Sequence, residues 1–193
     1  MTRTIAREIA VQLVYSLSIN KLDASEMLDS FFAKDYYSTL KQEDPLYTDR
    51  PDNLQRGYIE KLVTGVAENQ DMLRSYIEKY AKNWKIGRIS KTAVSAMAVS
   101  IYEILYMEDI PNAAAINEAV EVSKGYEEQE TVAFINGILG SFIRGELKGA
   151  EIEEPAELMY EIAKPGYEDD EPVQDNYEPV QEDDEPQGDT DSY

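Results

Sequence analysis

Apolar side chains in the first 147 residues recur every three or four positions, the spacing that places them on one face of an α-helix. In the first segment, Ile5, Ile9 and Leu13 follow one another at intervals of four residues. We find no sustained alternation of β-branched and polar residues with the period of two that is typical of strands. The pattern therefore predicts an all-α protein.

The same spacing, together with capping residues and prolines, predicts about seven helices in two small bundles that divide near residues 84–87. Trp84 is expected to fill the seam between the bundles. Residues 34–52 are polar, rich in tyrosine and contain two prolines, so we expect a mobile loop there. The expected helices contain residues 5–17, 24–32, 53–68, 69–80, 90–107, 112–125 and 130–146.

Charge is distributed unevenly along the 193 residues, whose net charge is −21. Residues 1–150 have a net charge of −5, whereas residues 151–193 contain one basic and seventeen acidic side chains, a net of −16. From residue 165 onward almost no aliphatic side chain is present, so burial cannot offset the loss of chain entropy. We expect a helical domain over residues 1–150 and an acidic, largely disordered tail over residues 151–193, with a possible short helix at 155–164.

Composition excludes several kinds of chemistry. The chain has no cysteine and no histidine, which rules out disulfides, thiolate zinc sites, cysteine nucleophiles and imidazole bases. It also lacks a phosphate-binding glycine loop and a nucleophile elbow, and spaced carboxylates such as Glu118 and Glu121 are typical of a solvated helix face. We predict a protein that is not an enzyme and requires no cofactor or metal.

No apolar stretch approaches the ~18–20 residues that cross a bilayer, and the first ten residues lack a signal-peptide pattern. The sequence therefore predicts a cytoplasmic protein that does not bind membranes.

Two features are compatible with nucleic acid as a ligand, but the residues alone favour an ordinary structural alternative for each. Arg3 and Arg7 are expected to project from the side of the first helix opposite its apolar stripe, where cations can follow a phosphate backbone or simply be solvated. Phe134 lies off the stripe formed by its neighbours in the last predicted helix. An aromatic ring in that position can stack on an unpaired base or pack against another helix.

Four blocks of sequence, in this order and at this spacing, resemble the NusB (N-utilisation substance B) family of transcription antitermination proteins. The resemblance covers about residues 2–147 and leaves the acidic tail outside. The blocks are TIAREIAVQLVY at 4–15, SIYEIL at 100–105, DIP at 109–111 followed by AINEAVE at 115–121, and FINGIL at 134–139.

The resemblance implies an all-helical pair of bundles without enzymatic activity. It implies binding of single-stranded boxA RNA from ribosomal RNA leaders, together with a small-subunit ribosomal protein (NusE), in the transcription elongation complex. The family's RNA contacts match Arg3, Arg7, Glu130 and Phe134, and Tyr15 matches its contact to the ribosomal protein.

The chain also departs from the family pattern. Thr4 and Ile5 occupy positions where further arginines are expected, and Ala93, Val94 and Ala98 replace charged residues of the middle helix. These departures favour an alternative, a diverged helical adaptor that keeps a protein partner but has lost RNA binding. A fused RNA methyltransferase is excluded, because no cofactor-binding α/β region follows residue 150.

Overall fold

The computed structural model describes residues 1–20, 22–82 and 86–147, which form eight α-helices, two short 3-10 helices and no strand. The predicted all-α fold is confirmed. Trp84, the possible helix at 155–164 and the acidic tail lie outside the described residues. The elements are α1 (Arg3–Ile19), α2 (Ala24–Phe32), α3 (Lys34–Glu43), η1 (Pro45–Tyr47), α4 (Asn53–Glu68), α5 (Gln70–Tyr80), η2 (Ile86–Arg88), α6 (Lys91–Tyr106), α7 (Asn112–Lys124) and α8 (Gln129–Glu146).

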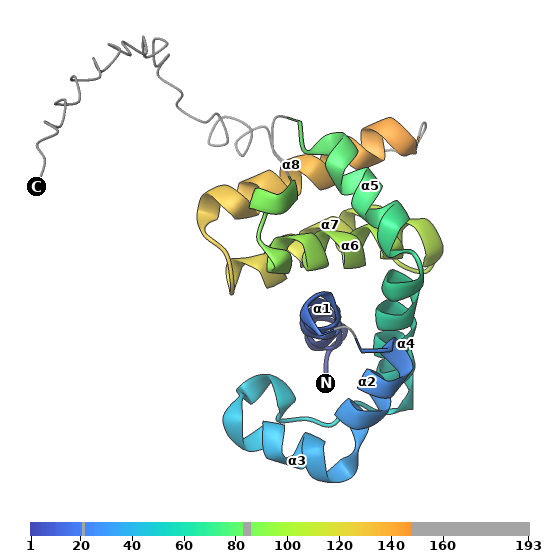
Figure 1. Cartoon of the computed structure of the whole chain (residues 1–193), viewed down its shortest axis with the longest axis vertical. Helices are drawn as coiled ribbons and strands as arrows, with labels where there is room; N and C mark the ends of the chain where they lie inside the picture. Colours follow the sequence, from blue (N-terminus) through green and yellow to red (C-terminus); the bar gives the residue numbers. More distant parts are fainter. Residues whose placement is uncertain (21, 83–85, 148–193) are drawn as a thin grey trace, which may run out of the picture.

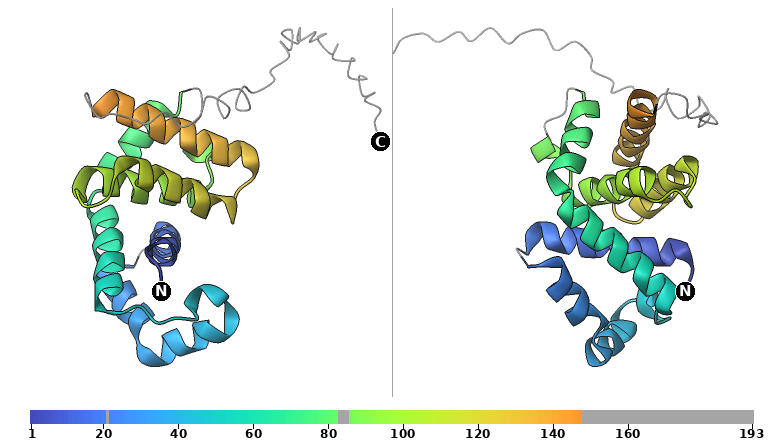
Figure 2. Two further views of the ribbon diagram at one scale, coloured as in Figure 1. Left: turned by 180° about the vertical axis from the view of Figure 1, so that it is seen from behind. Right: turned by 90° about the vertical axis from the view of Figure 1, so that its right-hand side faces the viewer.

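The helices form two sets, α1–α4 and α5–α8, with α1 packed against α4 of its own set and α6 of the other (Figures 1 and 2). The division falls between α4 and α5, so the expected boundary near residues 84–87 is wrong. α5 belongs to the second set because its apolar face packs against α6 and α8. The rings of Tyr76 and Tyr80 meet the ring of Phe142 edge-on, with centroids 5.1 and 6.1 Å apart.

Small residues allow α6 to lie at the centre of the fold. Residues from Ala93 to Glu103 are buried almost without interruption, and most of those near the start of the helix are alanine or serine. α4 approaches α6 closely at Gly65, where an added Cβ atom would lie 2.0 Å from Cζ of Tyr102. With helices on several sides, α6 fixes the position of α1 and therefore of the residues that α1 carries.

The segment 34–52 is not the mobile loop that the sequence suggests. It contains α3 and η1, which are held to α2 by a cluster of aromatic rings. Phe31, Tyr37 and Tyr47 contact one another edge-on, with centroid distances of 5.6 to 5.9 Å. Two of the tyrosines that make the segment look polar, Tyr37 and Tyr47, bury their rings here, and the Tyr37 hydroxyl donates to the carbonyl of Asp49 at 3.1 Å.

Candidate RNA- and partner-binding surfaces

Arg7 is buried between helices instead of projecting to solvent, and in this respect the sequence prediction is wrong. Only 3% of Arg7 is exposed. Its Nε and Nη2 donate to the carboxylate of Glu103 on α6 at 2.9 to 3.1 Å, and its Nη1 donates to Glu118 on α7 at 2.8 Å. The helix has no free side at this position, because α4, α6 and α7 enclose it. Arg7 therefore joins the two helical sets.

The electrostatics of this cluster are balanced by hydrogen bonds. Burial alone lowers the pKa of Arg7, but the hydrogen bonds from its guanidinium to Glu103 and the nearby carboxylate charges outweigh burial and raise it. Tyr58 on α4 donates its hydroxyl to the same Glu103 carboxylate. Burial, and then the charge of Glu103, raise the pKa of Tyr58 far above its usual range. The cluster thus holds a permanent cation and a neutral phenol around a fully buried carboxylate.

Arg3, one turn earlier on α1, is exposed as predicted. Its guanidinium lies 5.6 Å from the centroid of the Tyr58 ring and 3.7 Å from the carboxylate of Asp109, in the loop after α6. A contact of this length on the surface contributes little stability. Arg3 is thus a cation available to an anionic ligand near the end of α6.

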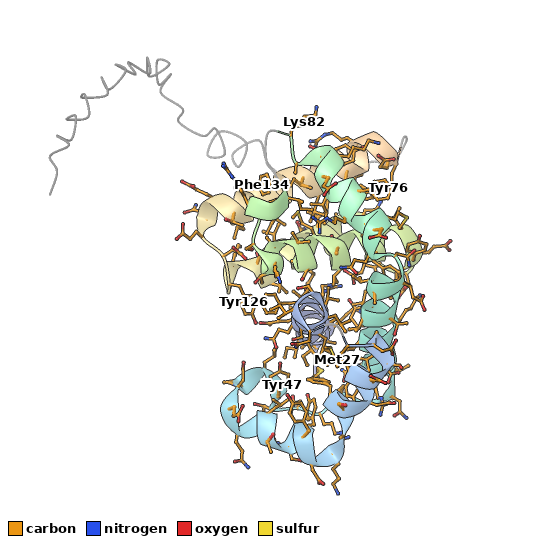
Figure 3. The ribbon with its side chains drawn as sticks, in the orientation of Figure 1. Met27, Tyr47, Tyr76, Lys82, Tyr126 and Phe134 are labelled. Atoms are coloured by element: carbon orange, nitrogen blue, oxygen red, sulfur yellow. The ribbon has the colours of Figure 1, made fainter. Side chains whose placement is uncertain are left out.

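Glu130 and Phe134 lie on the first turns of α8, at the other end of α6. Glu130 is exposed, and as an acidic residue in the first turn it also interacts favourably with the helix dipole. Phe134 is partly buried and packs against the core (Figure 3). One part of the ring packs against neighbouring helices and another part is accessible, so stacking of a base on Phe134 stays a prediction.

A basic segment that sequence analysis missed leads into α6, whose first residues lie beside this end of α8. Residues 82–91 contain four basic side chains and no acidic one. Within the described part of the chain, Lys82, Arg88 and Lys91 are exposed. The Ser90 hydroxyl donates to Glu127, just before α8, and this contact places the start of α6 next to the start of α8. Four basic residues within ten, without an acidic one, are the sequence signal that indicates this basic segment.

Tyr15 lies on the C-terminal half of α1, which packs near the start of α6. α1 and α6 run antiparallel, because Arg3 is near Asp109 whereas the carbonyl of Ser18 accepts from Nζ of Lys91 at 3.5 Å. Tyr15 is 37% exposed, and Ile19 and Tyr126 nearby are also exposed. The structure thus brings Tyr15, Glu130 and Phe134 toward one end of α6. Arg3 lies about 24 Å away along the 16-residue α6.

The described residues offer little else that indicates chemistry. No group of three or more acidic side chains there is placed to hold a metal ion. No helix in this part of the chain is long and apolar enough to cross a membrane.

Comparison with known proteins identifies the fold and its family. A family model described as the NusB family matches residues 4–144. The chain belongs to the NusB family. The transcription antitermination protein NusB of Acetivibrio thermocellus is 40% identical over 154 residues, covering 80% of this chain and 97% of the relative. NusB proteins are transcription antitermination factors without enzymatic activity, so the predictions of family and of a non-enzyme are confirmed.

Solved structures share the fold of this NusB-family chain at lower sequence identity. NusB of T. maritima is 21% identical, with a TM-score of 0.62, and the match covers 83% of this chain and 98% of that one. A chain in the crystal structure of a plectonemic RNA supercoil is 19% identical, also with a TM-score of 0.62, covering 77% and 98%. These likenesses extend the fold assignment to experimentally determined structures.

Proposed function

We propose that this antitermination factor binds single-stranded boxA RNA of ribosomal RNA leaders together with the small-subunit ribosomal protein NusE, and acts on the elongation complex in the cytoplasm. The observation that carries the proposal is the hydrogen bond from Ser90 to Glu127, which brings the start of α8, with Glu130 and Phe134, next to the basic residues at the start of α6. An exposed carboxylate, an aromatic ring and several cations are the groups that read and hold single-stranded RNA.

Each group has a distinct role in this proposal. Phe134 supplies a face on which a base can stack, and Glu130 accepts hydrogen bonds from base amino or imino groups. Arg88 and Lys91 neutralise phosphates, and Arg3 adds a more distant phosphate contact at the far end of α6. A single strand of several nucleotides can extend across such a separation, because sites of this kind take about 4–16 nucleotides. Arg7 supports the surface from within and is not one of its RNA contacts.

The partner surface in this proposal is the exposed face of α1 around Tyr15. Ile19 and Leu22 extend the apolar area of this face beyond Tyr15, with exposed fractions of 48% and 54%. Aromatic and apolar side chains of this kind form the centres of protein interfaces. The ribosomal protein would therefore dock beside the start of α8 and add its own basic surface to the RNA site.

A second candidate is the adaptor that keeps the protein partner without RNA. The observation that favours it is the charge of the surface itself, because Glu127, Glu128 and Glu130 lie close to the cations named above. RNA titrations with and without NusE separate the two candidates. The adaptor binds NusE but shows no preference for boxA over scrambled RNA.

Three variants and one control test the RNA site. Phe134→Leu keeps apolar bulk against the core but removes the aromatic face, so we expect boxA binding to weaken by about 1–3 kcal/mol while helical content is unchanged. Arg88→Ala and Lys91→Ala should each reduce the slope of log K against log salt by about one. Lys34→Ala, on α3 at the far side of the molecule, is the control that should leave the slope unchanged. Equal boxA affinity in Phe134→Leu and the wild type would place the site elsewhere.

A further inference from the structure

The loop between α7 and α8 is fastened to α1 by one tyrosine. The Tyr126 hydroxyl donates to Oε1 of Glu8 at 2.7 Å and accepts from Nε2 of Gln12 at 2.8 Å. On the other side of Gln12, its amide oxygen accepts from the hydroxyl of Tyr47 in η1. In Figure 3 both tyrosines lie beside α1, with Tyr126 coming from the upper helical set and Tyr47 from the lower one. A chain of side-chain hydrogen bonds therefore crosses the outer face of α1 and ends at the loop that leads into α8.

The first turn of α8 depends on this loop for its position. Glu128 occupies the N-cap position but its side chain makes no capping hydrogen bond. Among the described residues the loop is instead held through Tyr126 to α1 and through Glu127 to Ser90. Glu130 follows Tyr126 by only four residues. Any motion of the loop therefore moves the Glu130 carboxylate, which we propose reads a base edge.

The same tyrosine borders the proposed partner surface. Glu8, Gln12 and Tyr15 are spaced by four and three residues, so they lie on one face of α1. Tyr126 contacts the first two of these residues and still exposes 44% of its surface. A protein that covers Tyr15 therefore reaches the edge of the Tyr126 ring and excludes water from its hydrogen bonds.

We propose that Tyr126 is a positioning residue that couples binding at the Tyr15 face to RNA binding at the start of α8. This proposal rests on the proposed function, and it adds the residue through which partner binding at α1 reaches the RNA site at the start of α8. Hydrogen bonds strengthen when water is removed from around them, so a bound partner holds the loop more firmly. RNA then binds a start of α8 that is already ordered. The entropy lost on ordering has been offset by partner binding, so RNA binds more tightly.

The protonation state of Tyr126 suits this role. Burial, followed by the hydrogen bond to Glu8, raises the pKa of Tyr126 to about 12. The hydroxyl therefore remains a donor to the Glu8 carboxylate at neutral pH. The donor side of the link is therefore present throughout the physiological pH range.

The decisive measurement is the coupling factor, the ratio of boxA dissociation constants without and with saturating NusE. Tyr126→Phe keeps the ring and removes both hydrogen bonds, so we expect the factor to fall about three- to ten-fold, the effect of roughly one net hydrogen bond. Glu8→Ala should lower it similarly, and the double variant should lower it little further. Glu8→Gln retains an acceptor oxygen and should restore most of the coupling. Tyr36→Phe removes an exposed hydroxyl on α3 that makes no hydrogen bond in the described structure, and should have no effect.

A second readout requires no RNA. Adding NusE alone to the full chain should slow hydrogen exchange at the amides of residues 127–131 in the wild type, but not in Tyr126→Phe. If NusE binds and these amides exchange as before, or if Tyr126→Phe retains the full coupling factor, the role assigned to Tyr126 is overturned. Absence of NusE binding or of boxA binding in the wild type would instead refute the proposed function, and with it the need for a link.

Discussion

Replacing Arg7 by methionine should destabilise the protein strongly, because it leaves the carboxylate of Glu103 buried without a cation. Glu103 is fully buried and Arg7 is 3% exposed, so neither side chain can turn to water. Removing one partner of such a pair typically costs about 3–5 kcal/mol. At roughly 2–4 °C per kcal/mol for a chain of this size, we expect the melting temperature to fall by about 6–20 °C.

Thermal melting followed by circular dichroism measures this effect, and two further variants show its origin. Adding Glu103→Gln to Arg7→Met removes the stranded charge, so the double variant should melt above the single one. Arg3→Met removes an exposed ion contact of 3.7 Å to Asp109 and a guanidinium contact to the Tyr58 ring, and should change stability by less than about 1 kcal/mol. If Arg7→Met melts within about 2 °C of the wild type and instead weakens RNA binding at low salt, Arg7 contacts RNA and the buried cluster is misassigned.

Three other perturbations give expected outcomes from the same structure. Gly65→Ala should cost about 1–3 kcal/mol, because its Cβ would overlap Tyr102, whereas Gly57→Ala on the same helix meets nothing within 4 Å and should be neutral or stabilising in urea denaturation. The raised pKa values of Tyr126, Tyr47 and Tyr58 mean that the folded state holds phenol protons more tightly than the unfolded chain. Their contribution to stability is present below about pH 10 and lost as the pH rises through the folded-state values, so urea midpoints should be flat from about pH 7 to 9 and fall above 10, together with the appearance of phenolate absorbance. Deleting residues 151–193, which contribute a charge of −16, should tighten binding of scrambled RNA more than of boxA at low salt if the acidic tail competes for the basic surface, whereas unchanged affinities would leave it a solubility tail.

The sequence predicts most of the helices well. A helix with one buried face requires apolar residues every three or four positions, and this spacing is visible in the sequence. The 3–4 pattern marks α4 and α8 within one residue of their observed starts. It fails at α3 and η1, because Tyr37 and Tyr47 count as polar in the pattern although their rings are buried. A tyrosine contributes a large apolar surface with one polar atom, so a binary pattern cannot show which part of it decides its location.

The position of Arg7 could not be inferred from one helix alone. Residues two positions apart in sequence point about 200° apart around a helix. An arginine two positions from an apolar residue of the stripe is therefore expected to face water. That rule holds for a helix with one buried face, whereas α1 is packed between α4 and α6. The partners of Arg7 lie 96 and 111 residues further along the chain. Only the tertiary fold brings them to it.

The basic segment at 82–91 shows why the net charge of a chain is a poor guide to its ligands. A charge of −21 argues against nucleic acid if it is spread evenly, yet exposed charges act only over a Debye length of about 8–10 Å. Within that distance the field at the start of α6 is set by Lys91, Arg88 and the neighbouring carboxylates. Glu130 belongs to the first turn of α8, where the helix dipole already favours its negative charge. Cations for phosphate and a carboxylate for base edges can thus lie side by side on an acidic protein.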